Sequence, residues 1–376
     1  MHRHLEKAAN LAGFAAENAE VNSTSVKILT RESIVSDDPN FYMYIDQISN
    51  EFLVKTGFNI DKVHQLLVIL HADLSADIYV NDISVLVEVM SKRDVKKVEL
   101  IFENDIADIR CLKFPDVVFK DDDKVIYCFK KGWLFGLFFD LNGPAEKLDL
   151  DKMAISIGNI YRYLSFYNIY KVLETEDQFN EMKKDGWFPF TEIIPNPYRD
   201  ISSAYKNKID FDNKIKSIID KFDVARIEKM KNKWWRHKIF ADKKTLIEAG
   251  LNAYLQNSSE GFINCIKNLV SELEGILRYQ YFSDTSKGNH VKCDELIKFV
   301  VEKAKNRTGS GYSLLLPIPF LSYLKDVVFS DFDLENSQVD LSRNSSAHGV
   351  ADQILYTKSR AIQVILCIDQ IAYYIS

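Results

Sequence analysis

Residues 361–375 read Ala361-Ile-Gln-Val-Ile-Leu-Cys-Ile-Asp-Gln-Ile-Ala-Tyr-Tyr-Ile375. Apolar side chains recur there every three or four positions, and one stripe contains Ala361, Val364, Ile365, Ile368, Ala372 and Ile375. This period is typical of an α-helix that buries one face against neighbouring helices. We therefore predict that residues 353–375 form a helix of a bundle.

The residues before this helix have the same helical pattern. It predicts further helices over residues 246–255, 261–281, 293–305 and 313–329, and a short helix near residues 341–348. Together these segments predict an all-α domain over residues 226–376. Residues 151–225 also have a helical period, broken by Pro-containing stretches, and are interpreted as a connecting module.

The amino-terminal part has a different pattern. Short runs rich in β-branched and aromatic residues predict strands at residues 76–80, 84–89, 97–102, 115–119 and 124–129. Residues 61–72 have apolar side chains near helical spacing, which predicts a helix. The fold class is therefore predicted as α+β, with a β-rich sensor or regulatory domain over residues 1–150.

The composition is that of a compact globular protein. The chain has 376 residues, 47% hydrophobic and 27% charged, with 14 Gly and 8 Pro, which excludes collagenous and disordered classes. Its longest apolar runs are far shorter than the ~20 residues of a membrane-spanning helix, so no membrane partner is predicted. The absence of a recognisable leader predicts a cytoplasmic protein. Five widely spaced cysteines are interpreted as reduced thiols.

Charge is uneven along the chain. Residues 226–376 hold 20 Lys and Arg against 17 Asp and Glu, whereas residues 1–225 have a net charge of −9. Residues 226–244 contain eight basic and two acidic residues, with two adjacent tryptophans among them. Such a stretch is typical of a surface that binds an RNA backbone and stacks its bases. The predicted RNA-binding residues are Lys231, Lys233, Trp234, Trp235 and Arg236. Buried tryptophans with lysines that reach outward are an equally good interpretation.

One pair of side chains is singled out for chemistry. Among seven histidines, His348 alone has an arginine four to six residues upstream, namely Arg343. On a helix these two residues lie ~140° apart, whereas Asn344 and His348 share a face. A short helix with arginine in its first turn can instead present both side chains to one cleft, particularly one shared with a second subunit.

An imidazole beside a guanidinium has the chemistry needed to cleave RNA. The histidine can move a proton to or from the ribose 2′-OH or the leaving 5′-oxygen, and the arginine can offset charge on the phosphorane. Arg343 and His348 are therefore the predicted catalytic residues. This chemistry requires no metal, and no cofactor is predicted.

The motif Arg343-Asn-x-x-x-His348-Gly resembles the Arg-polar-x-x-x-His motif of HEPN (higher eukaryote and prokaryote nucleotide-binding) domains. The upstream stretch at residues 269–278, with Glu274 and Arg278 one helical turn apart, resembles the first long helix of such domains. The resemblance covers about residues 245–376. It implies a helical bundle that forms a homodimer and acts as a metal-independent endoribonuclease, with Asn344 orienting the site.

The resemblance also implies a toxin or anti-phage effector, with RNA as substrate and an antitoxin or phage-derived trigger as candidate regulator. Other interpretations stay open. Arg343 and His348 also fit a bundle that only dimerises or binds RNA or protein, without catalysis. Glu274 and Arg278 also fit an ordinary ion pair on a solvated helix face.

Overall fold

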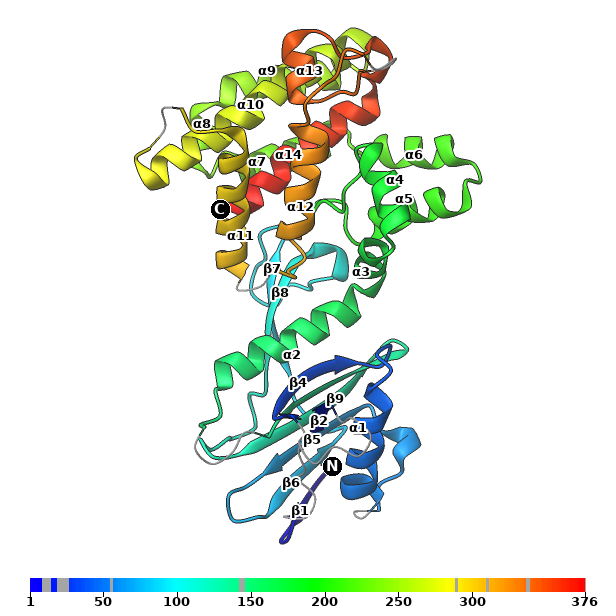
Figure 1. Ribbon diagram of the computed structural model, residues 1–376, viewed down its shortest axis with the longest axis vertical. Helices are drawn as coiled ribbons and strands as arrows, with labels where there is room; N and C mark the ends of the chain where they lie inside the picture. Colours follow the sequence, from blue (N-terminus) through cyan, green and yellow to red (C-terminus); the bar gives the residue numbers. More distant parts are fainter. Residues whose placement is uncertain are drawn as a thin grey trace. The chain divides into compact units, whose positions relative to one another are not determined.

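The computed structural model describes residues 1–8, 15–18, 27–54, 57–141, 146–287, 290–308, 311–335 and 339–375 (Figure 1). The chain divides into two compact units. The first contains Met1–Met90 and Asp108–Tyr167, and the second contains Ser91–Ala107 and Asn168–Ser376. The first holds an antiparallel sheet and the second is mainly helical, which confirms the α+β class. The boundary at residues 167/168 lies inside the predicted connecting module.

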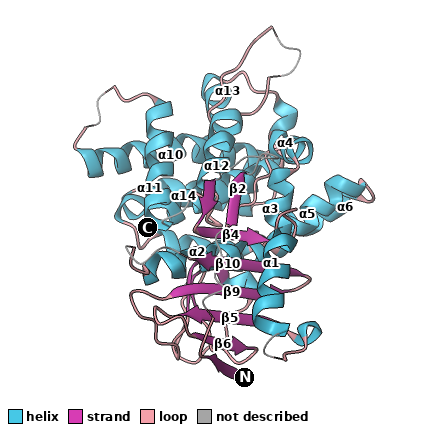
Figure 2. Ribbon diagram, turned by 60° about the horizontal axis from the view of Figure 1, so that its bottom comes forward, coloured by secondary structure: helices cyan, strands magenta, loops and turns pink. Residues whose placement is uncertain are grey.

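The first unit is built on a six-stranded antiparallel sheet of order β1-β6-β5-β9-β10-β4 (Figure 2). The strands are β1 (His2–Leu5), β4 (Arg31–Val35), β5 (Gln65–Leu70), β6 (Ala76–Val80), β9 (Lys124–Lys131) and β10 (Leu134–Asp140). One face packs on α1 (Phe41–Ile48) and the π-helical residues Ser49–Val54, and the other packs on α2 (Leu150–Ser165).

The helix predicted over residues 61–72 is wrong, because β5 occupies this stretch. Leu66 and Val68 pack on the α1 side of the sheet, whereas Leu67 and Ile69 pack on the α2 side. A strand buried on both faces is apolar at every position and so loses the alternation that would identify it.

The remaining strand predictions have mixed outcomes. Strands at residues 76–80 and 124–129 are confirmed, and the one predicted at 84–89 appears as β7 (Leu86–Ser91). Residues 97–102 and 115–119 form no strand, so those two predictions are wrong. Two further pairs complete the described strands. They are β7 with β8 (Ile106–Lys113), and β2 (Ala15–Asn18) with β3 (Lys27–Leu29).

The second unit contains α3–α14 and the 91–107 segment between β7 and β8. Its helices are α3 (Tyr167–Glu174), α4 (Glu176–Lys184), α5 (Asn196–Asn207), α6 (Phe211–Ile219), α7 (Val224–Trp234), α8 (Lys238–Asp242), α9 (Lys244–Leu255), α10 (Ser259–Thr285), α11 (Cys293–Thr308), α12 (Pro317–Tyr323), α13 (Arg343–His348) and α14 (Lys358–Ile375). The π-helical residues Leu324–Val328 extend α12. Each predicted carboxy-terminal helix is present, but two begin later than predicted: α14 starts at Lys358, after a separate 3-10 turn at Gln353–Leu355, and α12 starts at Pro317.

Helix α14 lies at the centre of the second unit and packs against α10 and α11 (Figure 1). Its side chains are buried on every face from Ile365 to Ile375, so the predicted apolar stripe is one part of a helix that neighbours surround. Among the described residues, no helix combines the length and the apolar character that crossing a bilayer requires.

Candidate functional site

The predicted short helix is present as α13, which begins at Arg343 and ends at His348. Ser342 caps its start: the Ser342 side chain accepts from the backbone N–H of Ser345, and the Ser345 hydroxyl accepts from that of Ser342. Gly349 ends it with a left-handed φ of 72°. These caps satisfy backbone groups at both ends of a six-residue helix that is too short to be stable alone.

Arg343 is held at the surface by Glu274 of α10. The Arg343 Nη2 atom lies 2.6 Å from Glu274 Oε2, and the Arg343 side chain is 32% exposed against 12% for Glu274. Glu274 also forms an ion pair with Arg278, one turn further along α10. One shielded carboxylate therefore connects two arginines, and the predicted intrahelical pair is part of a three-residue cluster.

Asn344 joins Arg343 to the chain segment before α13. Its amide oxygen accepts from Arg343 Nη1 at 3.2 Å, and its Nδ2 donates to the carbonyls of Phe329 and Ser330 at 3.3 Å. The same Nδ2 lies 3.1 Å from the Asp331 carboxylate. Asn344 thus restrains both the guanidinium and the 329–331 segment.

His348 lies at the opposite end of α13 and is exposed. Its ring centroid is 5.5 Å from that of Phe332. Within the described contacts, no hydrogen bond or ion pair joins the His348 side chain to Arg343, in line with their separation around a helix. Within one chain, the two predicted catalytic residues therefore face solvent as separate groups.

The cavity next to Arg343 is small. It has a volume of about 30 Å³ and is lined by Ser342, Arg343, Gln363 and apolar side chains of α10 and α14. A space of this size holds a water molecule or two but no nucleotide. A larger cavity of about 680 Å³, with Trp187, Tyr205 and Phe211 in its wall, includes neither Arg343 nor His348. Any RNA at Arg343 would therefore bind on an open surface.

The predicted RNA-binding stretch lies partly in the core. Trp234 is completely buried and its Nε1 donates to Asp369 Oδ1 at 2.7 Å. An indole without an exposed face cannot stack on a base, so the prediction is wrong for Trp234, and the alternative of a buried tryptophan is confirmed. Trp235 is half-buried and contacts the Trp234 ring edge-on.

The basic side chains of this stretch have acidic partners. Lys233 lies 3.3 Å from the Glu192 carboxylate, and Lys231 forms ion pairs with Glu228 and Glu248. These two lysines are largely shielded from solvent. Arg236 is 58% exposed and contacts Asp94 at 2.7 Å. Of the five predicted RNA-binding residues, Arg236 keeps the most exposed cation.

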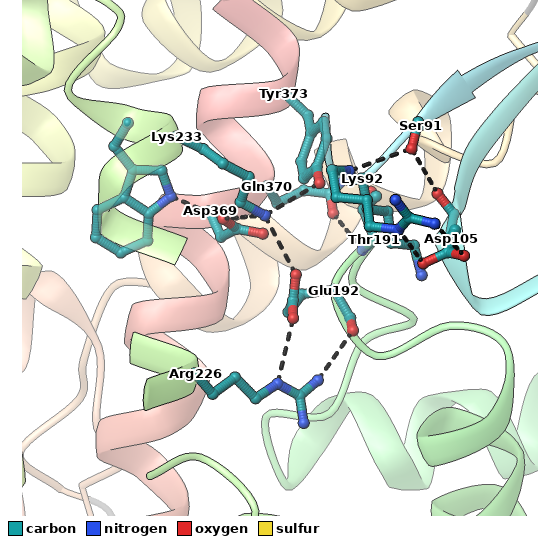
Figure 3. A network of polar contacts seen from close by, with 12 residues as sticks. Ser91, Lys92, Asp105, Thr191, Glu192, Arg226, Lys233, Asp369, Gln370 and Tyr373 are labelled. Carbon is teal, nitrogen blue, oxygen red and sulfur yellow. Dashed lines mark hydrogen bonds and ion pairs between the residues drawn. The ribbon is translucent and has the colours of Figure 1, made fainter. Parts of the chain in front are cut away.

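Lys233 belongs to a buried network of charges that the sequence pattern did not predict (Figure 3). Glu192 lies at its centre and pairs with both Arg226 and Lys233, while Asp369 of α14 accepts from Trp234. Burial raises the pKa of Asp369. Burial acts to raise the pKa of Glu192 too, but the nearby cations outweigh it and the pKa is lowered.

Lys92, in the segment between β7 and β8, completes this network. It is buried, and its Nζ donates to the Ile194 carbonyl. Burial lowers its pKa to about 8, because the charged ammonium loses its hydration. No local motif identifies such a residue, because its partners lie about 100 positions away in the sequence.

Within the described residues, no three His, Cys, Asp or Glu side chains are arranged to hold a metal ion. A scan of protein-family models and searches of curated proteins and of solved structures found no match to this chain. The functional interpretation therefore depends on the residues and their geometry.

Proposed function

We propose that this chain is a metal-independent endoribonuclease with a HEPN-like helical domain, acting as a toxin or anti-phage effector. One observation carries the proposal. A capped six-residue helix presents an exposed imidazole at one end, and at the other a guanidinium whose orientation is set by a shielded carboxylate. These are the two groups that phosphodiester transfer to a neighbouring hydroxyl requires.

In the proposed reaction His348 accepts the proton of a ribose 2′-OH. The 2′-oxygen then forms a bond to phosphorus while the bond to the 5′-oxygen breaks, and a protonated histidine returns a proton to this leaving oxygen. Arg343 donates N–H groups to the non-bridging oxygens, whose negative charge increases in the transition state. The products are a 2′,3′-cyclic phosphate and a 5′-hydroxyl end.

Two observations support a homodimer as the active form. Within one chain the two side chains are separate, and the neighbouring cavity is too small to enclose a nucleotide. A twofold contact would bring two Arg343–His348 pairs into one cleft.

The test is RNA cleavage by purified protein with EDTA present. We expect Arg343→Ala and His348→Ala each to lower the cleavage rate by at least 100-fold, because each removes one half of the chemistry. The exposed residues Arg199 and His64 provide matched controls, and their alanine variants should cleave like wild type. Cleavage that persists in both site variants would refute the proposal.

A non-catalytic HEPN-like module that dimerises or binds RNA or protein is the second candidate. The ion pair between Arg343 and Glu274 favours this second candidate, because such a pair also fits a purely structural tether between α13 and α10. This candidate predicts that wild type leaves RNA intact and that light scattering reports a mass near twice 43.4 kDa. A monomer would contradict the composite cleft of the first candidate and the dimerising form of the second.

A further inference from the structure

Both carboxylate oxygens of Glu274 bind arginine. Oε2 lies 2.6 Å from Arg343 Nη2, whereas Oε1 lies 2.6 Å from Arg278 Nη2 and accepts from Arg278 Nε at 2.8 Å. Arg278 Nη1 also donates to the Val291 carbonyl at 3.0 Å. Because the two arginines share one carboxyl group, both guanidinium groups lie within hydrogen-bond distance of the same acid.

The two arginine side chains of the cluster are more exposed to solvent than the Glu274 side chain between them. The side chain of Glu274 is 12% exposed, that of Arg343 32% and that of Arg278 41%. The three side chains carry a net charge of +1, and the shielded group is the negative one. A ligand in solution can therefore reach the two guanidinium groups more easily than the carboxylate.

The two guanidiniums keep donors for a ligand. In the described part of the chain, the contacts above and the one to Asn344 use three of the five N–H groups of Arg278 and two of those of Arg343. Guanidinium N–H groups in a fixed plane match the paired oxygens of a phosphate. A tether between α13 and α10 requires Arg343 alone, and Arg278, although it also holds the Val291 carbonyl, keeps two N–H groups for a ligand.

We propose that Arg278 is a second phosphate-binding residue of this site and that Glu274 is the residue that positions it beside Arg343. The two arginines bind neighbouring phosphates of one single-stranded RNA, and Arg343 receives the phosphate that reacts. The identity of the ligand rests on the proposed function. Arg278 acts in binding, and Glu274 acts through the two arginines.

The first test measures binding separately from cleavage. The probe is a fluorescent single-stranded RNA with 2′-O-methyl groups, which has no 2′-hydroxyl to react, and anisotropy is recorded over a range of salt concentrations. Arg278→Ala should bind several-fold more weakly, with a salt slope shallower by about 0.7, the value for one lost phosphate contact. Arg278→Lys keeps the charge and should keep the slope.

A matched control is Lys305→Ala, which removes a partly exposed cation from an intrahelical ion pair on α11. This variant should keep the affinity and the slope of wild type. Thermal unfolding of each variant checks that the fold is intact, and Arg278→Gln, which also removes the charge and should show the same shallower slope, provides the readout if Arg278→Ala fails to fold.

The second test separates positioning from simple charge. Glu274→Gln raises the net charge of the cluster from +1 to +2. If Glu274 only repelled RNA, this variant would bind more tightly and cleave at least as fast. Because the carboxylate positions both arginines, we expect kcat to fall about tenfold or more. The added positive charge offsets the weaker contact of the misplaced Arg278, so KM should stay near that of wild type.

Three results would overturn the inference: an Arg278→Ala salt slope equal to that of wild type, no binding of the probe by wild type, or an unchanged kcat in Glu274→Gln. Failure of the proposed function gives a different pattern. In that case the wild-type protein binds the probe with the Arg278-dependent slope but cuts no unmodified RNA, and the positively charged cluster is a binding site without catalysis.

Discussion

Replacement of Lys92 by Met tests the energetic effect of burying this lysine in the network of Figure 3. Lys92 is 7% exposed, its ammonium donates to the Ile194 carbonyl, and its pKa is lowered from 10.5 to about 8 by burial. Met has a similar length but no charge. Lys92→Met therefore removes the titrating group while most of the packing is kept.

The sign of the pH dependence follows from the direction of the pKa shift. Between about pH 8 and 10.5 the unfolded chain binds a proton at Lys92 that the folded chain has released, so the free energy of unfolding rises with pH in this window. A shift from 10.5 to about 8 corresponds to about 3 kcal/mol. Below pH 8 the charged lysine lowers stability by a constant amount, which the variant lacks.

The assay is urea unfolding of wild type and Lys92→Met at several pH values from 7 to 10.5. The difference between the two proteins matters, because other groups that titrate in this range contribute equally to both. We expect wild type to gain up to about 3 kcal/mol relative to the variant across the window. The variant also loses the hydrogen bond from Lys92 to the Ile194 carbonyl, which changes the difference in free energy of unfolding by an amount independent of pH. A difference that stays flat from pH 7 to 10.5 would mean that Lys92 is solvated.

Two further predictions concern packing. Trp234→Phe removes the donor to the buried Asp369 carboxylate and should lower the free energy of unfolding by about 2 kcal/mol in urea titrations. The control Trp235→Phe, at the half-buried neighbour, should lower it by less than about 0.5 kcal/mol. Equal effects of the two substitutions would contradict the burial of Trp234. In the first unit, a Cβ atom at Gly158 would lie 2.6 Å from the backbone of Cys111. Gly158→Ala should therefore cost about 1–3 kcal/mol despite its better helix propensity, and a Tm at or above that of wild type would show that α2 does not approach β8 so closely.

Periodicity predicts those helices of the second unit that have a face toward the core and a face toward water. Helix α14 is buried on every face from Ile365 to Ile375 and is recognised because its apolar pattern is long, whereas a short buried element is easily misassigned. Strand β5 is buried on both faces, and its unbroken run of apolar residues resembles a helix when taken alone. Which neighbours cover a segment depends on the whole fold, so no local window of sequence contains this information.

For the candidate site, the sequence predicts the local elements but not the contacts between distant residues. Residue types and spacing predict α13 with Arg343 at its start and His348 at its end, and they single out Glu274 and Arg278 as a pair. The ion pair between Arg343 and Glu274 joins residues 69 positions apart, and nothing in either motif predicts it. The basic stretch around Trp234 fails for the same reason, since its acidic partners Glu192 and Asp369 lie far away in the sequence.

Three buried polar side chains of helix α14 lie outside the candidate site and fix the position of this helix. Gln363 donates to the Asp185 carbonyl, Gln370 donates to the Leu315 carbonyl, and Asp369 accepts from Trp234. Each is buried, and leaving such a group without its partner would cost about 1–3 kcal/mol or more. Sliding or rotating α14 would break all three bonds at once, so they fix the position of the helix.

The same helix forms part of the cavity wall beside Arg343, through Gln363, Val364 and Cys367. A substitution at Asp369 is therefore expected to act on the candidate site without contact, by shifting the helix that lines the same cavity as Arg343. Asp369→Asn keeps the shape of the side chain and an oxygen that accepts from Trp234, whereas Asp369→Leu keeps a similar branched shape but has no oxygen to accept this bond. If α14 transmits the effect, RNA cleavage should survive the first change and fall in the second. Equal activity in both variants would mean that Glu274 and Asn344 hold Arg343 without a contribution from α14.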